Sequence, residues 1–404
     1  MNNNKSYFNG LSRREFIRKS GMTTLMFLGG FACATTDSRQ SSQLTAREKA
    51  VNNIFQVNLA VTKNERILVF TDDYKPEVVS EAEYVAKRGT NYCVINFLKY
   101  SNTGMSGVEP PKSLWEMALG KNVVKEIEDK KLMKNILDKK ISAEEFKIVH
   151  EIVKENKKDV INAVIALAWY STTHTSFRKL LTDAGGVRYA SMPGFDPRMW
   201  QTAMSANWEE VARRTLSLKD KLIGPTSARV RTRKGTDIVF DLKGREWFAD
   251  TGLINQPGNY GNLPAGELAI APLEETSNGK MVIEPIPRAQ GQAVFEVRHG
   301  KVTKISGDFP YISWWEANFQ KYPHARNIAE FGIGTNEKAK AGTTMLELEK
   351  ILGTIHIALG DNIGFGGKIR VPLHIDILFE NPTVDVTLSD GRTLQILQDG
   401  KVSW

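Results

Sequence analysis

Apolar and polar positions follow a strand–helix–strand order in the first half of this chain. Between residues 66 and 97, a short apolar run precedes a helical pattern that opens at Pro76 and ends at Gly89, and a second apolar run follows. This order favours a parallel sheet. A further apolar run and helical pattern at 160–185 extend it. The sequence therefore predicts an α/β domain with a parallel sheet over residues 45–225.

The pattern changes near Pro225. Before it, residues 121–158 carry many lysines and glutamates with apolar residues at helical spacing, which predicts exposed amphipathic helices. After it, short alternating apolar runs are separated by glycine, asparagine and aspartate, as in a β-rich domain. Only residues 343–352 show a clear helical pattern there. We therefore expect a β-rich α+β domain over residues 226–404.

The first residues have the pattern of an export signal. Arg13 and Arg14 lie in a polar, basic segment, and the apolar run that follows is too short to span a bilayer. The small residues of Ala32-Cys33-Ala34 suit cleavage after Ala34. We predict a twin-arginine signal peptide over residues 1–34, a periplasmic location and no stable membrane partner after export. A lipoprotein anchored through Cys33 is the weaker alternative.

Removal of this segment changes the interpretation of charge and cysteine content. Residues 35–44 form a polar linker, and cleavage before it lowers the formal net charge from +8 by four, to +4. This mildly basic surface argues against a nucleic-acid partner. Cys93 is then the single cysteine, so no intramolecular disulfide can form. The chain also lacks the glycine-rich nucleotide fingerprints, the Ser-hydrolase elbow and the H-E-x-x-H zinc motif.

Two histidines lie inside runs that otherwise read as buried strands. Alternate side chains of a strand share a face, so His374 and Asp376 point away from the apolar residues around them. By the same rule His356 points away from its apolar neighbours. Two imidazoles and a carboxylate are a donor set for Zn²⁺, Mn²⁺, Co²⁺ or Fe²⁺. An alternative is a polar strand face that contacts water, or a hydrogen-bonded core histidine.

Two glutamates add to this set. Glu267 follows a Pro-Ala-Gly turn at the start of an apolar strand, and Glu330 directly precedes Phe331-Gly332-Ile333-Gly334. Glycines there would allow close backbone approach. Taken separately, each glutamate is more often a solvated loop carboxylate.

Four segments in order carry a resemblance to the aminopeptidase T family of metallo-aminopeptidases. They are NLPAGELAIAP at 262–272, AEFGIGTN at 329–336, GTIHIALGDN at 353–362 and HIDILFENPTV at 374–384. The similarity covers roughly residues 50–404. It implies an aminopeptidase with a peptide substrate, two divalent metal ions (Zn, Co or Mn) and a homodimer. The metal ligands that the resemblance implies are Glu267, Glu330, His356, His374 and Asp376, with Glu330 also as the catalytic proton carrier.

One position departs from that family. Ile363 stands where active members carry a tyrosine seven residues after the histidine of HIALG, and Tyr260 and Asp361 are the candidate substitutes for it. Two other functions therefore stay open. One is a mononuclear iron dioxygenase that cleaves an aromatic ring, because a dihydroxypyridine dioxygenase resembles the same superfamily and needs only His356, His374 and Asp376. The other is an inactive metal- or peptide-binding relative.

Overall fold

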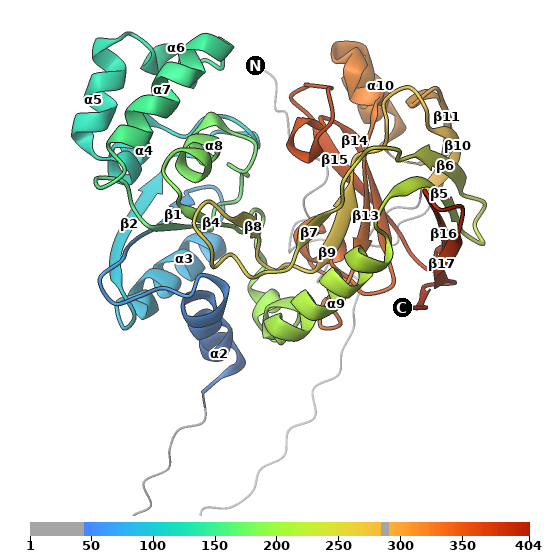
Figure 1. The fold of residues 1–404 in the computed structure, drawn as a ribbon, viewed down its shortest axis with the longest axis horizontal. Helices are drawn as coiled ribbons and strands as arrows, with labels where there is room; N and C mark the ends of the chain where they lie inside the picture. Colours follow the sequence, from blue (N-terminus) through green and yellow to red (C-terminus); the bar gives the residue numbers. More distant parts are fainter. Residues whose placement is uncertain (1–43, 284–290, 310) are drawn as a thin grey trace, which may run out of the picture. The chain divides into compact units, whose positions relative to one another are not determined.

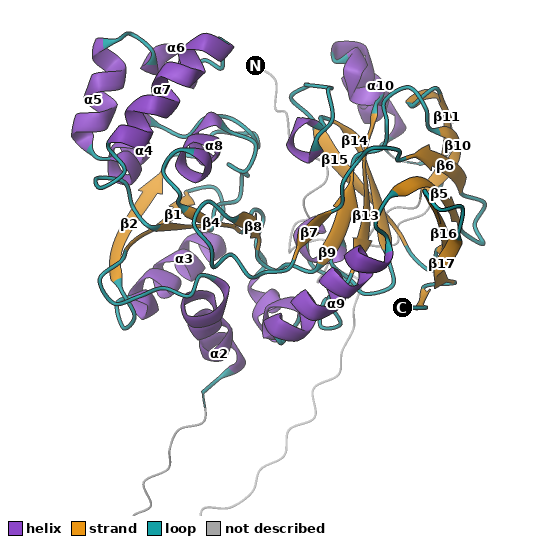
Figure 2. Ribbon diagram, viewed as in Figure 1, coloured by secondary structure: helices purple, strands orange, loops and turns teal. Residues whose placement is uncertain are grey.

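A parallel sheet and two antiparallel sheets make up the fold (Figures 1 and 2). The computed structural model describes residues 44–283, 291–309 and 311–404. The predictions for residues 1–43, namely the signal peptide, cleavage after Ala34, the lipid anchor at Cys33 and nearly all of the linker, fall outside these residues. Among the described residues no helix has the length and apolar character needed to cross a bilayer. Export and a homodimer stay predictions.

The first sheet is parallel, as the strand–helix–strand pattern predicts. Pro76 stands at the first turn of α3, and the helix buries one apolar face that includes Val78, Ala82 and Val85. Its strands, in sheet order, are β2 (Val94–Tyr100), β1 (Arg66–Asp72), β3 (Ala163–Ala166), β4 (Arg188–Ser191) and β8 (Tyr260–Asn262). Strand β8 comes from beyond Pro225, and its three residues are too few to show a pattern in the sequence.

Short helices surround this sheet, and those in the lysine- and glutamate-rich stretch confirm the amphipathic pattern there. Helix α7 begins with a capping box in which Ser142 and Glu145 bond each other's backbone amides. The helices of the first region are α2 (Ala46–Asn53), α3 (Pro76–Gly89), α4 (Lys112–Leu119), α5 (Lys121–Asp129), α6 (Met133–Leu137), α7 (Ala143–Glu155), α8 (Ser176–Asp183) and α9 (Trp208–Lys221).

An eight-stranded antiparallel sheet starts at Pro225. Its strands, in sheet order, are β12 (Lys301–Gly307), β11 (Ala293–Arg298), β10 (Asn278–Ile283), β6 (Asp237–Asp241), β5 (Pro225–Arg231), β16 (Thr383–Leu388), β17 (Thr393–Gln398) and β18 (Lys401–Val402). The β-rich second region is thus present. The division at Pro225 stays a prediction, since residues Ala46–Trp404 form one compact unit.

The third sheet packs face to face with the second. Phe240 of the eight-stranded sheet stacks on Phe331 of the third at 5.2 Å between ring centroids, and both belong to one apolar core. The strands of the third sheet, in order, are β15 (His374–Phe379), β14 (Ile355–Gly360), β13 (Ile328–Gly334), β9 (Glu267–Ile270) and β7 (Phe248–Asp250).

Helix predictions in the second region are partly wrong. The pattern at 343–352 yields only α11 (Met345–Leu348), because the chain turns before Lys350. The longer helix α10 (Ile312–Lys321) was not predicted. Its sequence is rich in aromatic residues with modest helix propensity. Burial of Trp315 and Phe319 in the apolar core stabilises it instead.

Candidate metal centre

Four strands of the third sheet carry the five candidate ligands. Glu267 begins β9, Glu330 lies in β13, His356 lies in β14, and His374 and Asp376 lie in β15. These strands are adjacent in the sheet, as Figure 1 shows. The structure therefore brings together five residues that span more than 100 positions of the sequence.

Strand register puts the five side chains on one face. Glu330 pairs with Ala358, which pairs with Asp376, while Gly360 pairs with His374. Gly334 pairs with Glu267. Small residues therefore alternate with the ligands on this face. The other side of each strand carries the apolar residues, which enter the core. We call the two sides the ligand face and the core face.

Gly332 shows how closely the ligand face is packed. It lies opposite His356, and a Cβ on Gly332 would stand 2.0 Å from the Cε1 atom of that imidazole. Real Cβ contacts are never this short, so the His356 ring occupies the space that the missing side chain leaves.

The ligand atoms form two groups that share Glu330. The inner group contains Glu267, Glu330 and His356, and the outer group contains Glu330, His374 and Asp376. Within each group the atoms lie within 4.8 Å of one another.

Distances place Glu330 between the two histidines. Its Oε1 lies 3.4 Å from His356 Nε2 and its Oε2 lies 2.9 Å from His374 Nε2. His374 Nε2 is 3.5 Å from Asp376 Oδ1, and His356 Nε2 is 3.6 Å from Glu267 Oε2. The mononuclear iron site considered above needs His356, His374 and Asp376, but these three residues do not form one group. Glu330, rather than His356, lies beside His374 and Asp376.

The two groups differ in access. His356 and Glu330 are 1% and 2% exposed, whereas the side chains of His374 and Asp376 are 16% and 19% exposed. The inner group is thus almost fully buried, whereas two members of the outer group are partly exposed.

His374 is oriented as a metal ligand should be. Its Nδ1 lies 2.7 Å from the backbone carbonyl oxygen of Asp361, an acceptor, so Nδ1–H donates there. The lone pair of the neutral imidazole is then on Nε2, the atom that faces Glu330 and Asp376. Histidine ligands commonly donate their other N–H in this way.

Mutual attraction shifts the protonation equilibria of the group. Burial alone would raise the pKa of Glu330, but hydrogen bonds with His356 and His374 outweigh it and lower the pKa to about 2. Burial alone would lower the pKa of His356, but Glu330 and Glu267 raise it to about 9. The face thus holds carboxylates that stay ionised and imidazoles that attract protons, so a divalent cation can replace those protons.

A buried lysine adjoins the inner group. Lys350 is fully buried, and its Nζ lies 2.7 Å from Glu267 Oε1 and 2.8 Å from Glu349 Oε1. Asp250 Oδ2 is 3.8 Å away. Burial is the main cause that raises the pKa of Asp250 to about 7 and that of Glu349 to about 8. Sequence reasoning missed this cluster, because a lysine in a helical pattern is usually solvated.

Aromatic side chains adjoin the outer group. Phe365 stacks on the His374 ring at 5.6 Å between centroids, and His174 lies 5.8 Å from the same ring. Phe248 contacts Phe365 edge-on at 6.3 Å and stacks on Tyr260 at 5.9 Å. We call these four residues, Phe365, His174, Phe248 and Tyr260, the aromatic wall. Phe365 lies in a glycine-rich loop, where the sequence gives no sign of a role.

Comparison with known proteins identifies the family. A model of the family described as NicX, 2,5-dihydroxypyridine 5,6-dioxygenase, matches residues 197–403, just over half of the chain. This chain belongs to that family. All five candidate ligands lie within the matched segment.

A curated relative supports the assignment to the dioxygenase family. The 2,5-dihydroxypyridine 5,6-dioxygenase of Pseudomonas putida is 25% identical over 202 residues, which are 45% of this chain and 56% of the relative. The match thus spans about half the length of the relative.

Two solved structures share the fold. The 2,5-dihydroxypyridine dioxygenase from Pseudomonas putida has a TM-score of 0.62 at 18% identity and covers 89% of this chain and 98% of its own. Wild-type AmpT from Thermus thermophilus has a TM-score of 0.55 at 15% identity, with 89% and 99% covered.

These findings correct the predicted activity. The resemblance to aminopeptidase T is right for the fold, as the similarity to AmpT shows. The prediction of a metallo-aminopeptidase, a hydrolase, is wrong, because the family and the curated relative are dioxygenases. This chain shares its fold with both AmpT and the dioxygenase, so the resemblance reports the scaffold rather than the reaction.

Ile363 and its two suggested substitutes have structural surroundings that differ from one another. Ile363 is exposed and begins a short 3₁₀ turn, Ile363–Phe365. The Asp361 side chain accepts hydrogen bonds from the backbone amides of Ile363 and Val371, so it shapes the loop. Tyr260 belongs to the aromatic wall, with the Arg178 guanidinium 4.1 Å from its ring centroid.

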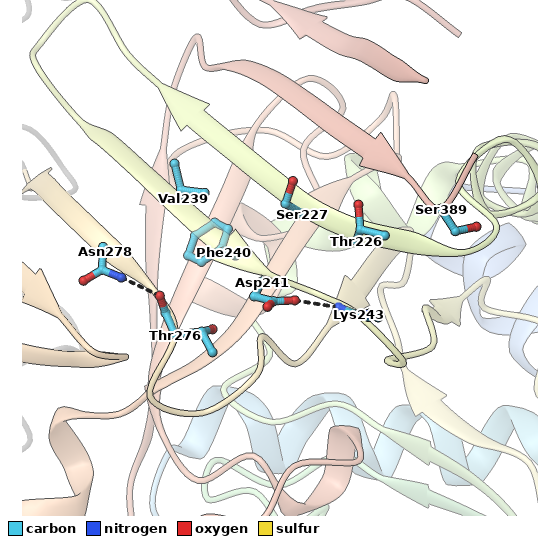
Figure 3. Close-up of a pocket in the computed structure, with 9 residues that line it drawn as sticks. All are labelled: Thr226, Ser227, Val239, Phe240, Asp241, Lys243, Thr276, Asn278 and Ser389. Carbon is cyan, nitrogen blue, oxygen red and sulfur yellow. Dashed lines mark hydrogen bonds between the residues drawn. The ribbon is translucent and has the colours of Figure 1, made fainter. Parts of the chain in front are cut away.

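One surface depression lies away from the ligand face (Figure 3). It has a volume of about 580 Å³ and is lined by strands of the eight-stranded sheet, with Thr226, Asp241 and Asn278 among its residues. Its side chains bond locally, for example Asn278 Nδ2 to the Thr276 carbonyl at 2.6 Å. It contains none of the candidate ligands.

Proposed function

We propose that this chain is a non-haem iron dioxygenase that cleaves a hydroxylated aromatic ring, with hydroxylated pyridines as the first substrates to test. Its family and its curated relative support the class of reaction. The observation that carries the proposal is the outer group of Glu330, His374 and Asp376, in which His374 and Asp376 are partly exposed and His374 adjoins the aromatic wall.

The residues present suit ferrous iron. Imidazole nitrogen and carboxylate oxygen are ligands that Fe²⁺ accepts. Glu330, His374 and Asp376 would hold the ion, and His374 is already oriented through the Asp361 carbonyl. Ferrous iron would supply the electron transfer to dioxygen that amino-acid side chains cannot supply.

The aromatic wall supports a planar substrate. Aromatic rings prefer stacked or edge-on neighbours, and Phe365 presents such a surface beside His374. His174 is exposed and adds a ring nitrogen that could hydrogen-bond a hydroxyl group or the nitrogen of a pyridine. The wall would therefore orient a flat ring next to the ligands and limit the access of water.

The proposed reaction balances without a further reductant. A carbon–carbon bond of the ring breaks, and both atoms of one dioxygen molecule enter the product. Dioxygen is reduced and the two ring carbons are oxidised. The reaction needs only the ring compound and dioxygen as substrates.

The test is a measurement of oxygen uptake. The full chain is loaded with Fe²⁺ under anaerobic conditions and is then mixed with oxygenated buffer that contains the substrate. We expect 2,5-dihydroxypyridine or a related hydroxypyridine to cause uptake of one dioxygen per ring cleaved, with ¹⁸O from ¹⁸O₂ at two positions of the product. Asp376→Asn removes one of the three proposed ligands and should abolish uptake. Iron-loaded protein that consumes no oxygen with any of a panel of hydroxylated pyridines and benzenes would refute the proposal.

A further inference from the structure

Lys350 is a cation built into the interior of the protein. Its side chain has no exposed area, and its Nζ lies within 2.8 Å of carboxylate oxygens of both Glu267 and Glu349. Asp250, at 3.8 Å, is a third carboxylate nearby. A buried ammonium needs such partners, because removing it from water costs several kcal/mol.

This ammonium lies at one end of the candidate metal centre. Its partners Glu267 and Asp250 come from β9 and β7, which pair directly with each other. The other oxygen of Glu267, Oε2, faces His356 Nε2 at 3.6 Å and has no hydrogen-bond donor among the described residues. Glu267, a member of the inner group, therefore lies between Lys350 and His356. The residues of the outer group lie on β13 and β15.

We propose that the Lys350 ammonium restricts this centre to one divalent ion, held by the outer group of Glu330, His374 and Asp376. The inference rests on the proposed function only in requiring that a metal ion binds here.

Two physical effects support a single ion. A divalent ion bound by Glu267 would lie close to the ammonium on the other side of the same carboxylate, and the two positive charges would repel in a dry environment. Glu267 also cannot turn both oxygens to a metal without removing a close partner from Lys350. The outer group does not share this constraint. Among the described residues, Lys350 forms ion pairs with Asp250, Glu267 and Glu349 but not with Asp376.

The experiment compares the metal content of the full chain with that of Lys350→Met. Each protein is equilibrated anaerobically with Mn²⁺ as the probe, and bound metal per chain is measured by mass spectrometry after buffer exchange. We expect one ion in the wild type. Lys350→Met should bind two, because Glu267 no longer pairs with an ammonium and can join Glu330 and His356 as a ligand. Lys340→Met, an exposed lysine of the same segment, is the matched control and should bind one.

Two results would overturn the proposal. One is a wild type that binds two ions, and the other is a folded Lys350→Met protein that still binds one. Should Lys350→Met not fold, Glu267→Gln decides the question. We expect this variant to keep one ion with an affinity within about threefold of the wild type, and a loss of more than tenfold would overturn the proposal.

The outcome is independent of the reaction. One ion without oxygen uptake would refute the dioxygenase but support the role of Lys350. Two ions would refute the role of Lys350 whether or not oxygen is consumed.

Discussion

The two faces of the third sheet are made by the same strands and yet have opposite properties. Phe331, Ile357 and Ile377 pair with one another across β13, β14 and β15 and lie in the apolar core. One residue away, Glu330, His356 and Asp376 face the other side. Because a strand alternates its side chains, each strand can stabilise the fold and position a ligand at once. The core face supplies rigidity, and the ligand face supplies chemistry.

Loss of a ligand should have the largest effect. In His374→Ala the outer group loses its one imidazole, so metal affinity should fall by more than the roughly 100-fold that loss of a supporting hydrogen bond can cost. The metal-free protein should also lose some stability, because Glu330 and Asp376 lose the imidazole that pairs with them. Metal titration checks the affinity, and His324→Ala, at an exposed histidine, should leave it unchanged. Equal metal binding by both variants would contradict the assignment of the ligand face.

A change on the core side should do the reverse. Phe240→Ala removes the ring that stacks on Phe331 and should cost about 3–5 kcal/mol of unfolding free energy. The folded fraction should still bind metal in the wild-type ratio. Denaturant unfolding and metal content check both expectations. A variant of normal stability that loses metal would show that the two faces are not separable.

Alternation along β14 and β15 is also why the ligand face could be predicted from the sequence. The runs around His356 and His374 show which residues share a side, and the glycines near Glu330 indicate close packing. The grouping of the ligands could not be predicted, because it depends on the pairing of strands distant in sequence. Lys350 was missed for the same reason. Its partner Glu267 lies 83 residues away, and its own segment resembles an exposed helix.

The fold shows the same limit. Strong periodicity predicted β1, α3 and β2, whereas β8 is a three-residue strand that is defined only by its pairing with β4. Helix α10 depends on the burial of Trp315 and Phe319 rather than on helix propensity. The activity was mispredicted because the resemblance reflects the fold, which this chain shares with both AmpT and the dioxygenase.

Gly332→Ala should disturb the packing of the ligand face against His356. The new Cβ would meet the His356 ring at 2.0 Å, so the imidazole or the strand must shift, at a cost of about 1–3 kcal/mol. The pH dependence of metal binding and the unfolding free energy should both change. Gly391→Ala provides the comparison, because it strains a turn with φ +86° but has open space around its Cβ. If both variants lose stability and neither changes the pH dependence of metal binding, Gly332 has no role in positioning His356.

The smallest effect is expected at the aromatic wall. Phe365→Leu removes the ring that stacks on His374 but keeps an apolar side chain. Loss of an aromatic pair costs about 0.5–1.5 kcal/mol, which corresponds to a roughly two- to tenfold rise in KM for a hydroxypyridine. Metal content should not change. Steady-state kinetics across a panel of ring compounds checks this, and an unchanged KM for every substrate would remove Phe365 from the proposed binding surface.

The location of a bound iron is the most direct test of the central claim. A crystal of the full chain grown anaerobically with Fe²⁺ can be measured at the iron absorption edge, where anomalous scattering marks the metal alone. We predict one peak on the ligand face, within about 2.0–2.2 Å of His374 Nε2 and of oxygens of Glu330 and Asp376. A fully loaded crystal with no peak at these three residues would contradict the account.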